Sequence, residues 1–181
     1  MTSPELTPAD PGLFGPDSVS WRVHADPAMA LAGLRALLLQ AVHPIAMAGV
    51  AEHSDFRGDA WGRLFRTAHY VVETTFGTTQ EAQRAGAKVR GIHRKLSGID
   101  PESGKAYRVN DPELLRWVHC VEAESFLSTT VRCGLRLSST DQDRYYAEQQ
   151  TIAAPLVGLN PAFVPGSAAD MHDYFTDMRP Q

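Results

Sequence analysis

The sequence predicts an all-α protein, and three observations lead to that prediction. Apolar residues recur at helical spacing in successive segments, residues that favour helix starts precede those segments, and no convincing alternating strand or hairpin turn appears. A chain of 181 residues, 43% of them hydrophobic, suits one domain with a sizeable core. We therefore expect a single globular multi-helix domain over residues 18–181. Residues 1–17 contain four prolines and are expected to form a flexible tail or a strap.

Prolines, glycines and capping residues predict the helix boundaries. Asp26-Pro27 is typical of a helix start, and Pro44 predicts an end or kink directly after His43. Asn110 with Glu113 forms one expected capping box, and Ser139 with Gln142 forms another. The expected helices cover about 29–42, 59–76, 79–96, 110–133 and 139–158, with a short last helix from 167 and loops over 98–109 and 160–166.

Composition excludes several functional classes. The net charge of −4 argues against a nucleic-acid binder. The two cysteines, Cys120 and Cys133, form neither a CxxC pair nor a cluster with zinc spacing, and the absence of CxxCH excludes covalently attached c-type haem. The acidic N-terminal stretch does not resemble a secretory signal, so we expect a cytoplasmic protein. Residues 28–51 are apolar but interrupted by polar groups, which favours a buried core helix over a membrane span and leaves peripheral membrane contact open.

Two of the expected helices carry cationic groups at helical spacing. Arg63, Arg66 and Thr67 share one face of the first, together with Tyr70. On the next helix the corresponding group is the pair Arg90 and His93, one turn apart. Two such helices could bind one anionic ligand. Haem suits the pattern, because an imidazole can bind its iron and guanidinium groups can pair with its propionates. The same spacing is also typical of arginines on the wet face of an ordinary amphipathic helix.

The remaining histidines permit a different kind of metal site. His24 and His172 lie near expected helix ends, where we expect them to be solvated. Di-iron bundles use Glu-x-x-His, which is absent, although His119-Cys120-Val121-Glu122 gives the reverse order once. A non-haem site would use Glu122 with a histidine drawn from His43, His53 and His119. Serine-hydrolase, P-loop and dinucleotide-binding fingerprints are all missing.

An ordered series of short motifs resembles the catalytic domain of the MpaB and latex-clearing-protein (rubber oxygenase) family, over roughly residues 18–178. The motifs are His43-Pro44, Ala51-Glu52-His53-Ser54, Trp61-Gly62-Arg63, Arg66-Thr67, Arg90-x-x-His93, Asn110-Asp111-Pro112 and Trp117-Val118-His119. The resemblance implies a globin-related helical core that holds b-type haem. It also implies oxygenase or peroxidase-like chemistry with dioxygen or peroxide on a small apolar substrate, such as an isoprenoid or lipid.

The same resemblance implies roles for particular residues. His93, one turn after Arg90, matches the axial iron ligand of the latex-clearing branch, and Arg63-x-x-Arg66-Thr67 matches the segment near the open face of the haem. Arg66 replaces a lysine of that branch, and Ser97 replaces an arginine. Arg66 puts the same distal chemistry in doubt, because a guanidinium stays protonated where an amine can exchange protons, and Ser97 is a second departure. Family members usually continue further, so the resemblance also implies a C-terminally short member.

Three hypotheses follow from the sequence. The first is a haem b oxidoreductase with His93 as iron ligand, Arg90 paired with a propionate, and Arg63, Arg66 and Thr67 lining the distal side. The second is a metal-free helical module that binds a small ligand or a partner helix, with its arginines in salt bridges. The third is the non-haem metal site. Substrate identity and oligomeric state stay open.

Overall fold

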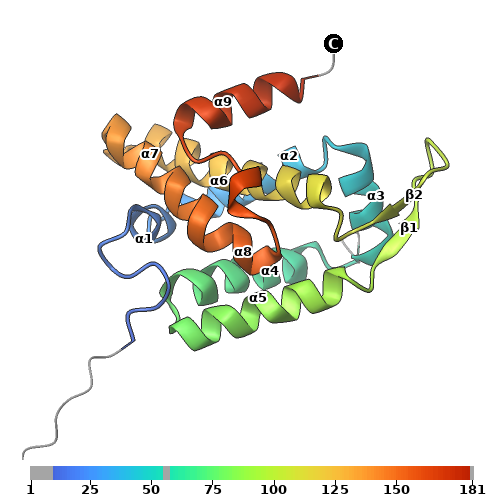
Figure 1. Cartoon of the computed structure of the whole chain (residues 1–181), viewed down its shortest axis with the longest axis horizontal. Coiled ribbons are helices and arrows are strands. Elements are labelled where there is room, and N and C mark those ends of the chain that lie inside the picture. Colours follow the sequence, from blue (N-terminus) through green and yellow to red (C-terminus); the bar gives the residue numbers. More distant parts are fainter. Residues whose placement is uncertain (1–9, 55–57, 180–181) are drawn as a thin grey trace, which may run out of the picture.

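The computed structural model describes residues 10–54 and 58–179, and within these ranges the chain is mostly helical (Figure 1). The prediction of an all-α fold is confirmed. In chain order the elements are α1 (Val19–His24), α2 (Met29–Gln40), α3 (Pro44–His53), α4 (Ala60–Phe76), α5 (Thr79–His93), β1 (Ser97–Ile99), β2 (Ala106–Arg108), α6 (Pro112–Arg132), α7 (Ser139–Glu148), a π-helical turn (Gln149–Ala153), α8 (Ala154–Val157), a 3₁₀ turn (Pro161–Phe163) and α9 (Ala168–Asp177).

The long helix α6 lies at the centre of the molecule. Buried side chains occur on several sides of it, including Leu114, Trp117, Val121 and Phe126. A helix that is apolar on more than one side must be covered on more than one side. In Figure 1 the antiparallel pair α4 and α5 lies on one side of α6, and α9 lies on the other.

Helix α2 packs directly against α6 through small side chains. Ala32 and Ala36 are buried in the core, and their methyl groups permit close approach of the two backbones. Arg35 lies between them on the same helix and contacts α6, with Nη1 donating to Ser125 Oγ at 2.9 Å and Nη2 3.8 Å from Glu124 Oε1. A polar link therefore fixes the register of the alanine contact.

Helix α5 begins at a capping box formed by Thr78 and Glu81. Its Gly86 faces α8: a Cβ at this position would lie 2.7 Å from the carbonyl oxygen of Leu156. Only glycine permits so close an approach of helix and backbone. The contact places α8 beside the face of α5 that carries Arg90.

The segment 139–158 is helical throughout, as predicted, but not regular. Between α7 and α8 it forms a π-helical turn over Gln149–Ala153. Pro155 follows in the first turn of α8 and has no N–H with which to continue the α-helical hydrogen-bond pattern. An extra residue in the turn accommodates the proline, and π turns of this kind occur often at functional sites.

A short antiparallel hairpin corrects the prediction that residues 98–109 form a plain loop. Ser97 pairs with Arg108, and Ile99 pairs with Ala106. Strands of three residues are too short to show an alternating pattern, so no sequence pattern indicates this hairpin. The hydroxyl of Tyr107 donates to Glu52 Oε2 of α3 at 2.7 Å and holds the hairpin against the core.

Several predicted boundaries are displaced by a few residues. The cap of α6 is Asp111, whose side chain accepts from the Glu113 N–H, and not Asn110. The capping box of α7 is Ser138 with Asp141, one residue before the predicted pair. Helix α5 ends at His93, before the expected stop. Of the expected tail, residues 1–9 lie outside the described residues, and Asp10 accepts hydrogen bonds from the backbone and hydroxyl of Thr79.

Two helices expose apolar faces. Leu31, Leu34, Leu38 and Val42 are at least half exposed along α2 and its C-terminal end, as are Trp61 and Phe65 on α4. Within the described part of the chain, no single helix is long and apolar enough to cross a membrane. Helices α2 and α3 would pass that test only as a pair, and they are bent by 106° relative to each other.

Candidate active site

The two predicted arginines of α4 have different surroundings. Arg63 turns inward and is half-buried, and its Nη2 donates to Gln40 Oε1 at 3.2 Å. Arg66 turns outward, and its Nη1 lies 3.0 Å from Asp59 Oδ2 on the surface. Thr67 is partly buried between these two environments. The structure therefore brings Arg63, but not Arg66, towards the interior.

The predicted pair on α5, Arg90 and His93, also differs in surroundings. Arg90 Nη1 donates to the carbonyl oxygen of Leu156 at 2.7 Å, which satisfies a backbone acceptor of the short helix α8. His93 lies one turn further on and is partly buried. Its Nδ1 is buried and has no hydrogen-bond partner among the described residues. Burial lowers the pKa of this imidazole, which favours the neutral form that can bind a metal.

A carboxyl group from α6 faces the inward arginine. Burial raises the pKa of Glu122 to about 7, and the charge of Arg63 acts in the opposite direction. Burial lowers the pKa of the Arg63 guanidinium, which Glu122 raises again. Burial and the negative charge of Glu122 raise the pKa of Tyr70, while the charge of Arg90 lowers it. Arg63, Tyr70, Arg90 and Glu122 thus form one electrostatic cluster across α4, α5 and α6.

A small cavity of about 40 Å³ adjoins this cluster. Tyr70 and Glu122 line it, together with His24 and His119. Burial lowers the pKa of His119 to about 4, although a hydrogen bond with the Gln149 backbone acts to raise it. The Nε2 of the same ring is buried and has no partner in the part of the chain that the structure describes. The remaining lining residues are Phe14, Val71, Thr74, Thr75, Phe126, Gln149, Ala153, Leu156 and Val157.

His24 corrects the expectation of a solvated side chain. Its Nδ1 lies 2.7 Å from Thr75 Oγ1, and its Nε2 lies 3.3 Å from the hydroxyl of Tyr145. Burial lowers the pKa of the ring to about 3, so it is neutral over the physiological range. The helix α1 that carries it is short, and its end is covered by α4 and α7 rather than by solvent.

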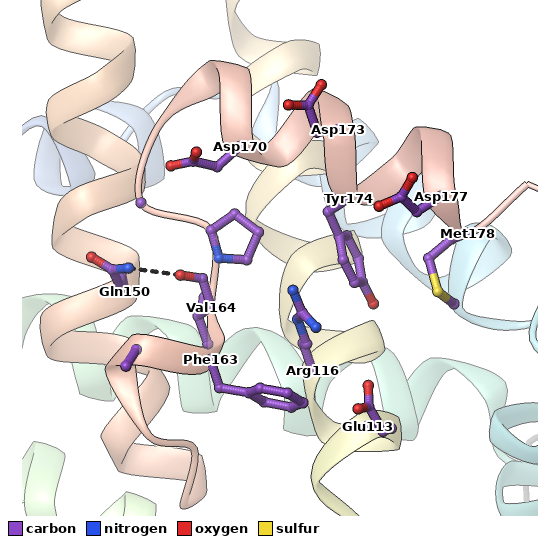
Figure 2. Close-up of a pocket in the computed structure, with 13 residues that line it drawn as sticks. Glu113, Arg116, Gln150, Phe163, Val164, Asp170, Asp173, Tyr174, Asp177 and Met178 are labelled. Atoms are coloured by element: carbon purple, nitrogen blue, oxygen red, sulfur yellow. Dashed lines mark hydrogen bonds between the residues drawn. The ribbon is translucent and has the colours of Figure 1, made fainter.

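A larger hollow of about 540 Å³ lies beneath α9 (Figure 2). In it the guanidinium of Arg116 is held between two aromatic rings, 4.5 Å from the Phe163 centroid and 4.6 Å from the Tyr174 centroid. Carboxylates from α6 and α9 surround this stack: Glu113, Asp170, Asp173 and Asp177. Neither His93 nor Arg90 lines this hollow or the small cavity.

The candidate non-haem site is not assembled in the described residues. No group of three or more histidine, cysteine, aspartate or glutamate side chains there could hold a metal ion. His43 instead caps α3, with its Nδ1 accepting from the Ala46 N–H, and His53 lies 4.0 Å from Glu52. The described residues therefore do not bring the ligands of the third hypothesis together.

A comparison with protein families matches residues 21–181 to the family described as "ER-bound oxygenase mpaB/B'/Rubber oxygenase, catalytic domain". The chain belongs to this family. No curated protein and no solved structure matches the chain. The mpaB/rubber oxygenase assignment confirms the resemblance drawn from the ordered motifs and makes the fold described above an oxygenase catalytic domain.

Sequence reasoning did not find the whole of the buried polar cluster. It proposed roles for Arg63 and His93, which are both partly buried, and placed Tyr70 on the same face of α4 without giving it a role. It considered His119 and Glu122 only as metal ligands. The available signal was their separation of three residues, which places both side chains on one face of α6.

Proposed function

We propose that the chain is a haem b-dependent oxygenase with His93 as the iron ligand. The observation that carries the proposal is the imidazole of His93, which is neutral at physiological pH and has a buried nitrogen with no partner among the described residues. A buried polar atom without a partner is unusual and needs an explanation. Coordination of iron would supply one, and the family assignment points to the same chemistry.

The side chains of His93 and Arg63 have the chemistry needed to hold haem. His93 would hold the iron, and Arg63 would supply a fixed positive charge in the partly buried space between α4 and α6. Haem, when bound, supplies the site at which dioxygen or peroxide is activated. Arg63 is held by Gln40 and faces Glu122, so its charge is oriented before any ligand arrives, which is the condition for effective electrostatic stabilisation.

The substrate proposed for this site is a small apolar molecule, in keeping with the family. Arg90 is proposed to pair with a haem propionate, but its guanidinium already donates to the carbonyl oxygen of Leu156. Pairing with a propionate would require Arg90 to leave that carbonyl or to share its remaining donors. A guanidinium has five N–H groups, so sharing is chemically feasible.

The test is haem binding by the His93→Ala variant. We expect the wild-type protein to take up one equivalent of hemin and show a Soret band, and the variant to lose that band. His69 is the matched control, since it lies on the exposed surface of α4 with its side chain 76% accessible. His69→Ala should bind hemin as the wild type does. An unchanged spectrum at full occupancy in His93→Ala would contradict the assignment.

The metal-free binding module is the second candidate, and one observation favours it. Arg66 forms a salt bridge with Asp59, as that hypothesis predicts, whereas Arg90 donates to a backbone carbonyl instead. It expects a purified protein that stays colourless after hemin is added and removed by gel filtration. A pyridine hemochromogen assay on the filtered protein separates the two candidates.

A further inference from the structure

The cavity bounded by α4, α6 and the π-helical turn contains polar groups that the proposed function does not use. His119 is 7% exposed, and its Nε2 has no hydrogen-bond partner among the described residues. Glu122 also lines the cavity and is partly buried, and its carboxyl group has no hydrogen bond or ion pair among the described residues. Polar groups in the interior are normally satisfied by protein or by ordered water.

The size of the cavity identifies what can satisfy them. One water molecule needs at least about 10–15 Å³ of this kind of volume and two to four polar partners. The cavity offers about 40 Å³, room for up to about three waters. His119, Glu122, Tyr70 and Thr74 supply the polar partners. A larger polar ligand would not fit.

The other acid on the α7 side of the cavity already has hydrogen-bond donors. Glu148, which acts electrostatically on Tyr145, accepts from the backbone N–H groups of Val19 and Ser20. The titratable or charged groups that face Glu122 come from five elements: Arg63 and Tyr70 of α4, Arg90 of α5, His119 of α6, His24 of α1 and Tyr145 of α7. Arg63 and Arg90 are the only cations among them, since burial keeps both histidines neutral.

We propose that this cavity is a water-filled proton-exchange site in which Glu122 takes up and releases the proton. Waters would link its carboxyl group to His119 Nε2, and the charge of Arg63 would act on the same carboxyl group. The role in oxygen chemistry rests on the proposed function, whereas the cavity and its proton do not. The exchange involves no other bond: the carboxylic acid releases H⁺ to water and the carboxylate takes it back.

Infrared difference spectroscopy of the protein without hemin tests the proposal. We expect the wild type to show the carbonyl stretch of a protonated carboxylic acid at about pH 5 and to lose it as the pH rises through the pKa of about 7. Glu122→Gln should remove this band, and Glu122→Asp, which keeps a carboxyl group, should shift it. Glu113→Gln is the control, because Glu113 is an exposed carboxylate on the same helix.

Stability gives a second readout with a definite sign. The pKa of Glu122 is raised in the folded state from 4.5 to about 7, so its contribution is full below 4.5 and is lost as the pH rises through 7. The melting temperature of the wild type should therefore fall relative to that of Glu122→Gln between about pH 5 and pH 8. His119 titrates with the opposite sign but is present in both proteins, so its effect cancels in the difference.

Two results would overturn the proposal. One is the absence of a Glu122-dependent carbonyl band anywhere between about pH 5 and pH 9. The other is a high-resolution crystal structure whose cavity holds no density within hydrogen-bond distance of His119 Nε2. Failure of hemin binding would leave both readouts intact, so it would count against the proposed function alone.

Discussion

Arg63 and Arg66 lie one turn apart on α4 and meet opposite environments. Arg63 reaches Gln40 across the interface with α2, while Arg66 pairs on the surface with Asp59, which also caps the helix. The sequence places both residues on one face but cannot rank them, because the ranking depends on the position of α2 and α6. Gln40, the partner of Arg63, lies 23 residues away in the chain, whereas Asp59, the partner of Arg66, lies seven residues away.

Alanine substitutions should separate the two arginines. Arg63→Ala removes the hydrogen bond to Gln40 and the cation that faces Glu122, and we expect a loss of about 1–3 kcal/mol in the free energy of unfolding at neutral pH. Arg66→Ala breaks only an exposed ion pair, and such pairs contribute little to stability. We expect its denaturation midpoint to match that of the wild type. Equal losses in urea denaturation would show that Arg63 is not held as described.

At the scale of elements, helix existence was predictable and helix ends were less so. Apolar spacing and capping residues located α2, α4, α5, α6, α7 and α9, but the expected helices did not include α1 or α3. The caps of α6 and α7 were displaced by one residue because several adjacent residues, such as Asn110 and Asp111, can all accept the capping hydrogen bond. The hairpin β1–β2 depends on Tyr107 reaching Glu52, a contact between distant segments that no local pattern encodes.

The contact between α5 and α8 gives a prediction at this scale. A methyl group at Gly86 would lie 2.7 Å from the Leu156 oxygen and 3.1 Å from Arg90 Nη1, so Gly86→Ala should lower the free energy of unfolding by about 1–3 kcal/mol. Gly91 on the same helix has open space around it. Gly91→Ala should raise stability by about 0.5–1 kcal/mol through helix propensity. Chemical denaturation of both variants checks the pair, and a neutral Gly86→Ala would contradict the close packing.

For the whole molecule, the candidate site joins segments that are far apart in the chain. Local motifs located Arg63 and His93, since each belongs to a short ordered pattern. They could not locate the cavity, because it forms only where α4, α6 and the π-helical turn converge. Neither of the two hollows described above includes His93, so we expect α4 and α5 to change their packing if hemin binds as proposed. Pockets for ligands of drug size occupy roughly 300–1,000 Å³, and the cavity beside Glu122, at about 40 Å³, is far smaller than that.

Hydrogen exchange should reveal that change. On adding hemin we expect altered amide protection in α4 and α5, with the central helix α6 protected before and after, because the most buried helices open least. The His93→Ala protein should show no hemin-dependent change. If hemin binds the wild type while exchange in α4 and α5 stays the same, the ligand is on the surface and the proposed iron site is wrong.

The π-helical turn ahead of Pro155 has a consequence for insertions and deletions. A π turn holds one residue more than the α-helical turn that it replaces. Deleting a single residue between Gln149 and Ala153 would restore a regular turn and place Pro155 inside a continuous α-helix, where its ring clashes with the carbonyl oxygen one turn earlier. The resulting kink would move the carbonyl of Leu156 relative to Arg90 and alter the wall of the cavity, which Leu156 lines. Chains that differ here by one residue are therefore expected to differ in the interior of this site even where every other helix is the same length.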